Sequence, residues 1–147
     1  MGNIQTIHSV QKASFEDIQY CIEHTHDHIL ISTLPVYQQE CLILKTISAS
    51  VEEDLINKVI NEGQNKNMRV IIYGSNYSDE TIYDKYTQLS KLGFTNIYVY
   101  PGGVFEWLLL QDIYGKEDFQ TTSDQLDILK YKPSNIIHGG NRLLENG

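Results

Sequence analysis

The chain has little that would place it in a membrane or on nucleic acid. No apolar run approaches the roughly 20 residues that a transmembrane helix needs, and no signal-peptide pattern opens the sequence. Only 11 of the 147 residues are Lys or Arg, against 19 Asp or Glu. The resulting net charge of −8 argues against binding to duplex nucleic acid, whose phosphates require a basic surface. This length predicts one domain with a tail.

Cysteine is scarce, because the chain holds only Cys21 and Cys41 and neither belongs to a CxxC pair. Few thiols and no export signal are typical of a reducing intracellular compartment, cytoplasmic or organelle-associated. We expect Cys21 to pack inside an early helix as a small hydrophobe. Cys41 falls in an irregular stretch that we expect to be exposed. A sulfur carrier at Cys41 stays open as an alternative, although no activating base or helix N-terminus accompanies it.

Three alternate histidines, His24, His26 and His28, precede an apolar run. In an extended segment they would share one face and invite a metal ion. Neither a Cys/His pair at zinc-finger spacing nor a helical HExxH accompanies them, so a polar loop is the better interpretation. The sequence predicts no metal site and no cofactor.

Short apolar runs alternate with amphipathic segments along the chain. The runs at 29–31, 70–73 and 97–100 are continuous rather than alternating, which is typical of strands covered on both faces. The pattern predicts a parallel sheet flanked by helices on both faces, with right-handed crossovers. Weaker signals predict further strands at 7–10 and 42–44. Helix starts are expected at capping serines, and these are Ser14, Ser50 and Ser78.

The segment from Arg69 to Gly115 reads as strand, loop, helix, strand, Gly-Gly turn and helix. The loop after the first strand is Gly74-Ser75-Asn76-Tyr77-Ser78-Asp79. In an α/β fold, ligands usually bind in the loops at the carboxyl ends of the strands. This loop is therefore the first place to look for function.

Three features of the segment carry a family resemblance: Gly93-Phe94, then Tyr98-Val99-Tyr100-Pro101-Gly102-Gly103, then Phe105-Glu106-Trp107. They resemble the rhodanese-like domain, whose members include sulfurtransferases and phosphatases of the cell-cycle dual-specificity type. The resemblance implies one α/β domain over residues 1–115 and a C-terminal extension over residues 116–147. It also implies an active-site cysteine at the end of a strand, held as a thiolate by loop N–H groups and the next helix.

The departures from that pattern point away from catalysis. The resemblance puts the nucleophilic cysteine where Gly74 stands, and no Arg or Lys occurs from Gly74 to Tyr83. An Asp-x-Arg expected after an earlier strand is replaced by Ser32-Thr33-Leu34. We therefore expect no catalytic residues and a degenerate loop over 74–79. Ordinary loop hydrogen bonding and capping explains its serines and Asn76 better than a ligand site does.

The chain begins Met1-Gly2-Asn3-Ile4-Gln5-Thr6, which fits the N-myristoylation pattern at Gly2. The alternative is a second-position glycine that merely precedes a strand. One myristoyl chain gives only marginal membrane binding without a second signal. A lipid at Gly2 would therefore give reversible, membrane-peripheral attachment or lie buried in a protein partner.

After Gly115 the chain becomes mostly polar with dispersed apolar residues. We expect residues 116–132 to pack on the domain, with a short helix at 123–129, and residues 133–147 to meet a partner or be disordered. In the preceding helix, Phe105, Leu108, Leu109 and Asp112 can share one buried face. Trp107 would then lie on the other side, covering the tail or meeting a partner. The candidate interaction residues are Trp107, Tyr131, Ile136 and Ile137.

These observations favour a catalytically inactive, rhodanese-like structural or protein-interaction module, tethered as a subunit of a larger assembly. The alternative is a sulfurtransferase or phosphatase-like enzyme that uses Cys41 or an external thiol near the loop. A phosphatase would need a cysteine and an arginine in one anion cradle, and the loop supplies neither.

Overall fold

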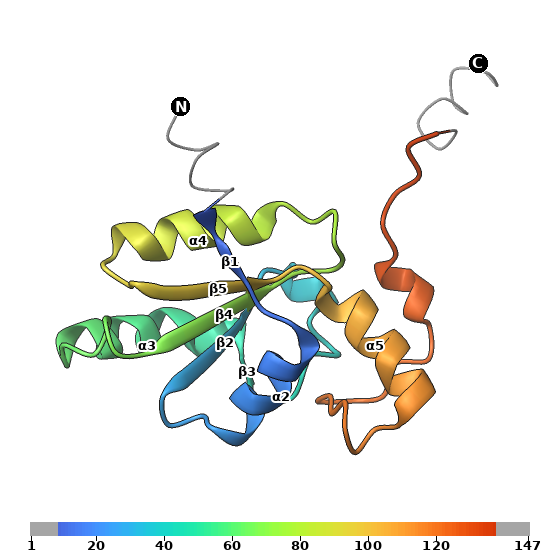
Figure 1. Cartoon of the computed structure of the whole chain (residues 1–147), viewed down its shortest axis with the longest axis horizontal. Helices are drawn as coiled ribbons and strands as arrows, with labels where there is room; N and C mark the ends of the chain where they lie inside the picture. The colour runs from blue at the N-terminus through green and yellow to red at the C-terminus, as the bar shows by residue number, and fades with distance from the viewer. Residues whose placement is uncertain (1–8, 138–147) are drawn as a thin grey trace.

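A computed structural model describes residues 9–137 and places them in one α/β domain around a five-stranded sheet (Figure 1). Every strand pairs in parallel with its neighbours, in the order β1-β5-β4-β2-β3. The strands are β1 (Gln11–Lys12), β2 (His28–Ser32), β3 (Thr46–Ile47), β4 (Arg69–Tyr73) and β5 (Asn96–Tyr100). The predicted parallel sheet is confirmed.

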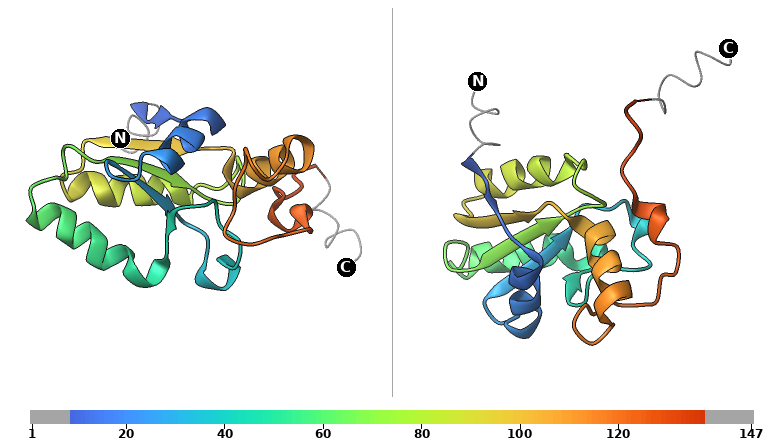
Figure 2. Two further views of the ribbon diagram at one scale, coloured as in Figure 1. Left: turned by 90° about the horizontal axis from the view of Figure 1, so that it is seen from below. Right: turned by 45° about the vertical axis from the view of Figure 1, so that its right-hand side comes forward.

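Helices cover both faces of the sheet, as the sequence predicts (Figure 2). The helices are α2 (Phe15–Glu23), α3 (Ala49–Asn61), α4 (Thr81–Lys91) and α5 (Gly103–Tyr114), with 3-10 turns η1 (Val36–Gln38) and η2 (Ile128–Tyr131). Successive residues of a strand point to opposite faces of the sheet, so each strand contributes side chains to the hydrophobic core on either face. Leu30 and Ile71 pack under α2 and α5, whereas Ile31 and Ile72 pack against α3 and α4.

The tail after α5 packs on the domain instead of leaving it. Gln120 and Thr122 exchange backbone hydrogen bonds with the segment beside Leu42, and Ile43 forms an antiparallel bridge with Thr121. Phe119 is 4% exposed and belongs to the same core as α2 and α5. The expectation that residues 116–132 pack on the chain itself is confirmed, while residues 138–147 lie outside the described range.

The two weakly patterned strands differ from the prediction where the structure describes them, and residues 7 and 8 lie outside the described range. In the described part of the 7–10 segment, Ser9 and Val10 lie outside any strand. Strand β1 follows at Gln11 and Lys12, which are exposed and polar, so no apolar pattern predicts it. Residues 42–44 form only the single bridge at Ile43, and β3 comes two residues after them. Lys45 explains the shift, because its φ of 71° interrupts the extended backbone between the two.

Helix boundaries also differ in detail. The capping box at Ser14 is confirmed, with the Ser14 N–H donating to Asp17 Oδ2 at 2.8 Å. Helix α3 begins earlier than expected, after Ser48, and α4 begins later, after Glu80. The helix predicted at 123–129 is replaced by η2, because Ser123 bonds to Glu40 and Gln125 bonds to the Asp127 N–H. Such local side-chain bonds compete with helix formation.

The buried face of α5 is not the predicted one. The buried residues are Gly103, Val104, Trp107, Leu108 and Gln111, while Leu109 is 39% exposed. Within residues 9–137, none of the helices combines the length and apolar composition needed to cross a bilayer.

Candidate functional site

The loop from Gly74 to Glu80 lies where three elements meet, namely the carboxyl end of β4 and the first turns of α4 and α5. Helix α5 begins directly on it, since the N–H groups of Val104 and Phe105 donate to the carbonyls of Gly74 and Ser75 at 3.0 and 2.9 Å. First-turn N–H groups of a helix have no partner inside the helix. Two of those of α5 are therefore satisfied by the loop backbone, and the loop is held against the helix.

The space beside Gly74 is taken up by the side chain of Asp79. A Cβ built on it would lie 2.3 Å from Asp79 Oδ2 and 3.0 Å from Thr33 Oγ1. Both atoms belong to side chains, so a larger residue would require the Asp79 carboxylate to move. A carboxylate thus occupies the space into which the side chain of the expected cysteine would project.

Asp79 fills the concavity of the loop and binds its backbone. Its Oδ2 accepts the Ser75 N–H at 2.9 Å, and its Oδ1 accepts the N–H and hydroxyl of Thr81 at 3.0 and 2.5 Å. A carboxylate there also complements the positive end of α4. Ser78 was expected as the N-cap of α4, but the N-cap is Glu80, which makes no side-chain cap bond, and the first N–H of the helix is bound by Asp79 instead. The loop therefore carries its own anion.

The remaining loop side chains tie it to itself and to the tail. Asn76 Oδ1 accepts the Ser78 N–H at 2.9 Å, and Asn76 Nδ2 donates to the Tyr131 carbonyl at 2.9 Å. Tyr77 projects outward with 71% of its surface exposed. Asn76 and Ser78 thus make ordinary loop hydrogen bonds, as expected from their residue types.

A model of the rhodanese-like domain matches residues 37–110, which is half of the chain and includes the loop. The chain belongs to the rhodanese-like domain family. A search of curated protein sequences found no match.

Solved structures share this rhodanese-like fold at low sequence identity. Thiosulfate sulfurtransferase from Pseudomonas aeruginosa superposes with a TM-score of 0.57 at 13% identity, over 88% of this chain and 25% of that one. A rhodanese-like domain from Anabaena sp. gives 0.53 at 16% identity, over 85% and 86% of the two chains. A Bacillus halodurans protein gives 0.51 at 19% identity, over 71% and 74%. These similarities support the fold alone.

Both thiols of this rhodanese-like chain are buried. Cys41 is 1% exposed, which corrects the expectation that it is open to solvent. Its Sγ–H donates to the Ser123 carbonyl at 3.3 Å, and burial raises its pKa. Burial raises the pKa of Cys21 to about 12. A thiol reacts as its thiolate, so both environments disfavour the reactive form.

The segment that replaces the family's Asp-x-Arg is uncharged and bonds locally. Ser32 Oγ accepts the Leu34 N–H at 3.0 Å, and Thr33 Oγ1 lies 2.7 Å from Thr81 Oγ1. A second carboxylate, which sequence reasoning missed, belongs to Glu106 in the first turn of α5. It accepts the Tyr100 hydroxyl, and burial raises the pKa of Tyr100. Glu106 therefore places a second carboxylate in the first turn of α5, the helix whose first N–H groups bond to the loop.

The four candidate interaction residues separate into two pairs. Trp107 and Tyr131 are 0% and 2% exposed inside the domain's own core, which corrects their assignment to a partner surface. The Trp107 Nε1–H donates to the Gln120 carbonyl at 3.0 Å. Trp107 therefore packs against the tail, which is one of the two alternatives expected for it. Ile136 and Ile137 are 89% and 87% exposed. Gly2 lies outside the described residues.

The three histidines do not gather around one point for a metal. Among the described residues, no group of three or more His, Cys, Asp and Glu side chains is arranged to hold an ion. His24 bonds to the Tyr20 carbonyl, and His28 bonds to Asp27. Two of the three imidazoles therefore have a local hydrogen-bond partner, and His26 Nε2 lies 3.7 Å from Asp27 Oδ2.

Proposed function

We propose that this rhodanese-like chain is a non-catalytic structural or protein-interaction module, carried as a subunit of a larger assembly. The observation that carries the proposal is the Asp79 carboxylate lying where a Gly74 side chain would project. An anionic substrate or a persulfide would have to displace a carboxylate that accepts three hydrogen bonds from Ser75 and Thr81. Such charge-assisted bonds are about twice as strong as neutral ones.

The same carboxylate argues against an external thiol acting at the loop. A thiolate is favoured by nearby cations and helix N-termini. Here the N-terminus of α4 is already occupied by Asp79, and the sequence supplies no Lys or Arg from Gly74 to Tyr83. Like charges would raise the energy of an incoming anion. A sulfurtransferase or phosphatase-like activity stays the alternative, because a similar fold occurs in a thiosulfate sulfurtransferase.

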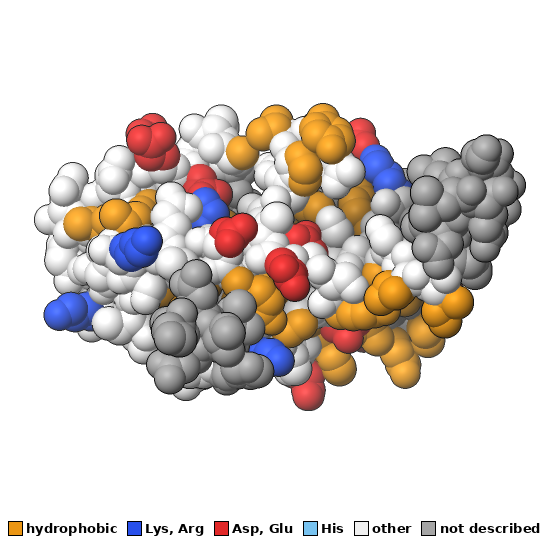
Figure 3. Space-filling model, turned by 90° about the horizontal axis from the view of Figure 1, so that it is seen from above, with side chains coloured by type: hydrophobic (Ala, Val, Ile, Leu, Met, Phe, Trp, Pro, Cys, Tyr) orange, Lys and Arg blue, Asp and Glu red, His pale blue; other side chains and the backbone are white. Residues whose placement is uncertain are grey.

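Exposed apolar side chains support the interaction part of the proposal. Val36 and Tyr37, which follow β2, are 74% and 80% exposed, and Tyr77, which follows β4, is 71% exposed. The carboxyl ends of parallel strands lie at one edge of a sheet, so these residues belong to the same edge. Hydrophobic side chains gather over this half of the molecule in the space-filling view (Figure 3). Exposed apolar patches commonly mark protein-interaction surfaces.

Partner capture from the native source tests this surface. We expect the double variant Tyr37→Ser/Tyr77→Ser to lose a copurifying protein that the native sequence retains, because aromatic side chains dominate interface energies. Tyr114→Ser is the matched control, since Tyr114 is 66% exposed at the far end of α5. Equal thermal midpoints would exclude unfolding as the cause. A partner that binds the double variant undiminished, or native protein purified alone, would contradict the proposal.

A myristoyl group at Gly2 is a separate part of this proposal. It would give the subunit reversible membrane contact or bury its lipid in the partner. The intact mass of the natural N-terminus tests it. We expect a mass that corresponds to acylated Gly2, and a bare or acetylated Met1 would remove the lipid from the account.

A further inference from the structure

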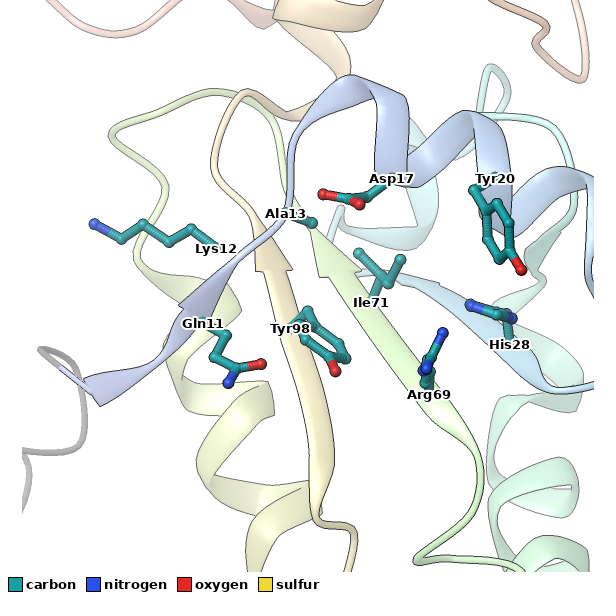
Figure 4. Close-up of a pocket in the computed structure, with 9 residues that line it drawn as sticks. All are labelled: Gln11, Lys12, Ala13, Asp17, Tyr20, His28, Arg69, Ile71 and Tyr98. Carbon is teal, nitrogen blue, oxygen red and sulfur yellow. The ribbon is translucent and has the colours of Figure 1, made fainter.

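A cavity of about 480 Å³ opens on the α2 side of the sheet, at the end opposite the loop (Figure 4). It arises because α2 and α5 leave the amino ends of β4 and β5 uncovered on this face. The parallel register sets its floor, since Arg69 pairs with His28 and Tyr98 pairs with both Ile71 and Gln11. Such a volume suits a small ligand.

One end of the cavity carries Arg69, an exposed residue at the start of β4. Arg69 is the only arginine between residues 9 and 137, and across that range its side chain makes neither an ion pair nor a hydrogen bond. Six lysines in the described part of the chain likewise lack an ion pair, and one of them, Lys12, also lines the cavity, so the shape of the guanidinium rather than its lack of a partner distinguishes Arg69. A guanidinium offers a rigid fork of donors that matches a carboxylate in two parallel hydrogen bonds.

His28 lies beside Arg69 and is held in one orientation. Its side chain is 4% exposed, and its Nδ1 lies 2.6 Å from Asp27 Oδ1 and 3.0 Å from the His24 carbonyl. Both neighbours are acceptors, so Nδ1 carries the proton and Nε2 is the atom left for a ligand. Figure 4 shows the His28 ring and the Arg69 side chain pointing toward one another. This end of the cavity therefore combines a fixed imidazole with an exposed guanidinium.

The opposite end of the cavity carries Asp17. Its Oδ2 is engaged by the N–H and hydroxyl of Ser14, whereas no described residue donates to its Oδ1. A second negative charge on a ligand would therefore meet repulsion there, but a hydroxyl could donate to Oδ1. Between the two ends lie Ala13, Ile71 and the Tyr98 ring, which give the cavity an apolar floor.

We propose that this cavity binds a small monocarboxylate with a flat, partly apolar body. The carboxylate pairs with Arg69 beside His28, the body lies on Ile71 and Tyr98, and a hydroxyl at the far end reaches Asp17. The site is independent of the loop at Gly74 and of the proposed function. It gives the chain a ligand that needs no catalytic residue.

The test is a titration of the full chain followed by backbone amide NMR, with 4-hydroxybenzoate as the probe. We expect saturable shifts that centre on His28, Arg69 and Tyr98, with a dissociation constant of about 1 mM or tighter. 4-Hydroxybenzamide has the same shape as 4-hydroxybenzoate but no charge. Inorganic phosphate is charged but has no aromatic ring. Both should bind at least about tenfold more weakly, because a hydrogen bond to a charged group is worth that factor or more.

Variants locate the site. Arg69→Gln should weaken the binding of 4-hydroxybenzoate at least about tenfold. Arg69→Lys should have an affinity between those of Arg69→Gln and the native protein, since lysine keeps the charge but cannot donate two parallel hydrogen bonds. Lys66→Gln removes the same charge from an exposed loop side chain nearby and should leave the affinity unchanged. Absence of saturable shifts in the native protein, equal binding to Arg69→Gln, or tighter binding of phosphate or the amide would each overturn the proposal.

Discussion

Replacing Trp107 by alanine is expected to lower the free energy of unfolding by about 3–5 kcal/mol, the range for large-to-small changes of buried aromatics. Trp107 is fully buried, and its ring lies edge-on to Phe119 and Tyr100 at centroid distances of 5.1 and 6.5 Å. Its Nε1–H donates to the Gln120 carbonyl, so the change also leaves a buried acceptor without its partner. Denaturant unfolding followed by circular dichroism measures the loss.

Leu109→Ala is the control on the same helix, because Leu109 is 39% exposed and lies outside the buried set of α5. It should cost about 1 kcal/mol or less. Trp107→Phe keeps a ring against Phe119 and should recover part of the loss. If Trp107→Ala costs no more than Leu109→Ala, the side chain does not join the tail to the core as the structure has it.

Gly103→Ala is the second change for which we expect a large effect, with a loss of about 3 kcal/mol or more from backbone strain and overpacking together. Gly103 has a φ of 67°, and a Cβ there would lie 2.6 Å from the Gly74 carbonyl oxygen and 2.9 Å from the Asn76 nitrogen. These are backbone atoms that cannot rotate away. The loop and α5 would be forced apart, which would break the bonds from Val104 and Phe105.

Gly63 provides a matched control for that strain. Its φ is 70°, but a Cβ built there meets nothing within 4 Å. Gly63→Ala therefore carries only the cost of the left-handed backbone, about 1–2 kcal/mol. Thermal unfolding of the two variants separates the terms, because only Gly103→Ala adds the clash. Equal losses would show that the first turn of α5 does not press on the loop.

The three central strands could be read from the sequence because each is a run of apolar, mostly β-branched residues buried on both faces. Gly93-Phe94 and the Gly-Gly turn likewise identify the family, since they depend on local backbone requirements. The sequence pattern does not predict strands β1 and β3, because each has only two residues and none of these is buried. Their positions depend on pairing with β5 and β2, which no local window contains.

The burial of Cys41 and Trp107 could not be predicted, because it depends on a tail distant in sequence. Cys41 is covered by the segment at Ser123, which lies 82 residues further along the chain. Helix α5 is apolar around most of its circumference, so periodicity could not select which of Trp107, Leu108 and Leu109 faces the core. Only the docked tail, through Phe119 and Gln120, decides it.

For the candidate loop, the sequence predicts which groups are missing but not the role of Asp79. The sequence of residues 74–83 shows directly that the loop has no cysteine, lysine or arginine. The role of Asp79 could not be predicted, since an Asp near a helix start most often does no more than favour the helix dipole. Its reach back to the Ser75 N–H follows from the tight turn after β4. That turn makes the carboxylate an internal substitute for a bound anion.

A cyanide:thiosulfate sulfurtransferase assay tests the central claim most directly, with the native chain and Cys41→Ser measured side by side. Because Asp79 closes the loop and Cys41 is buried, we expect neither protein to form thiocyanate faster than buffer does. Turnover by the native chain that disappears in Cys41→Ser would contradict the account and make Cys41 the sulfur carrier.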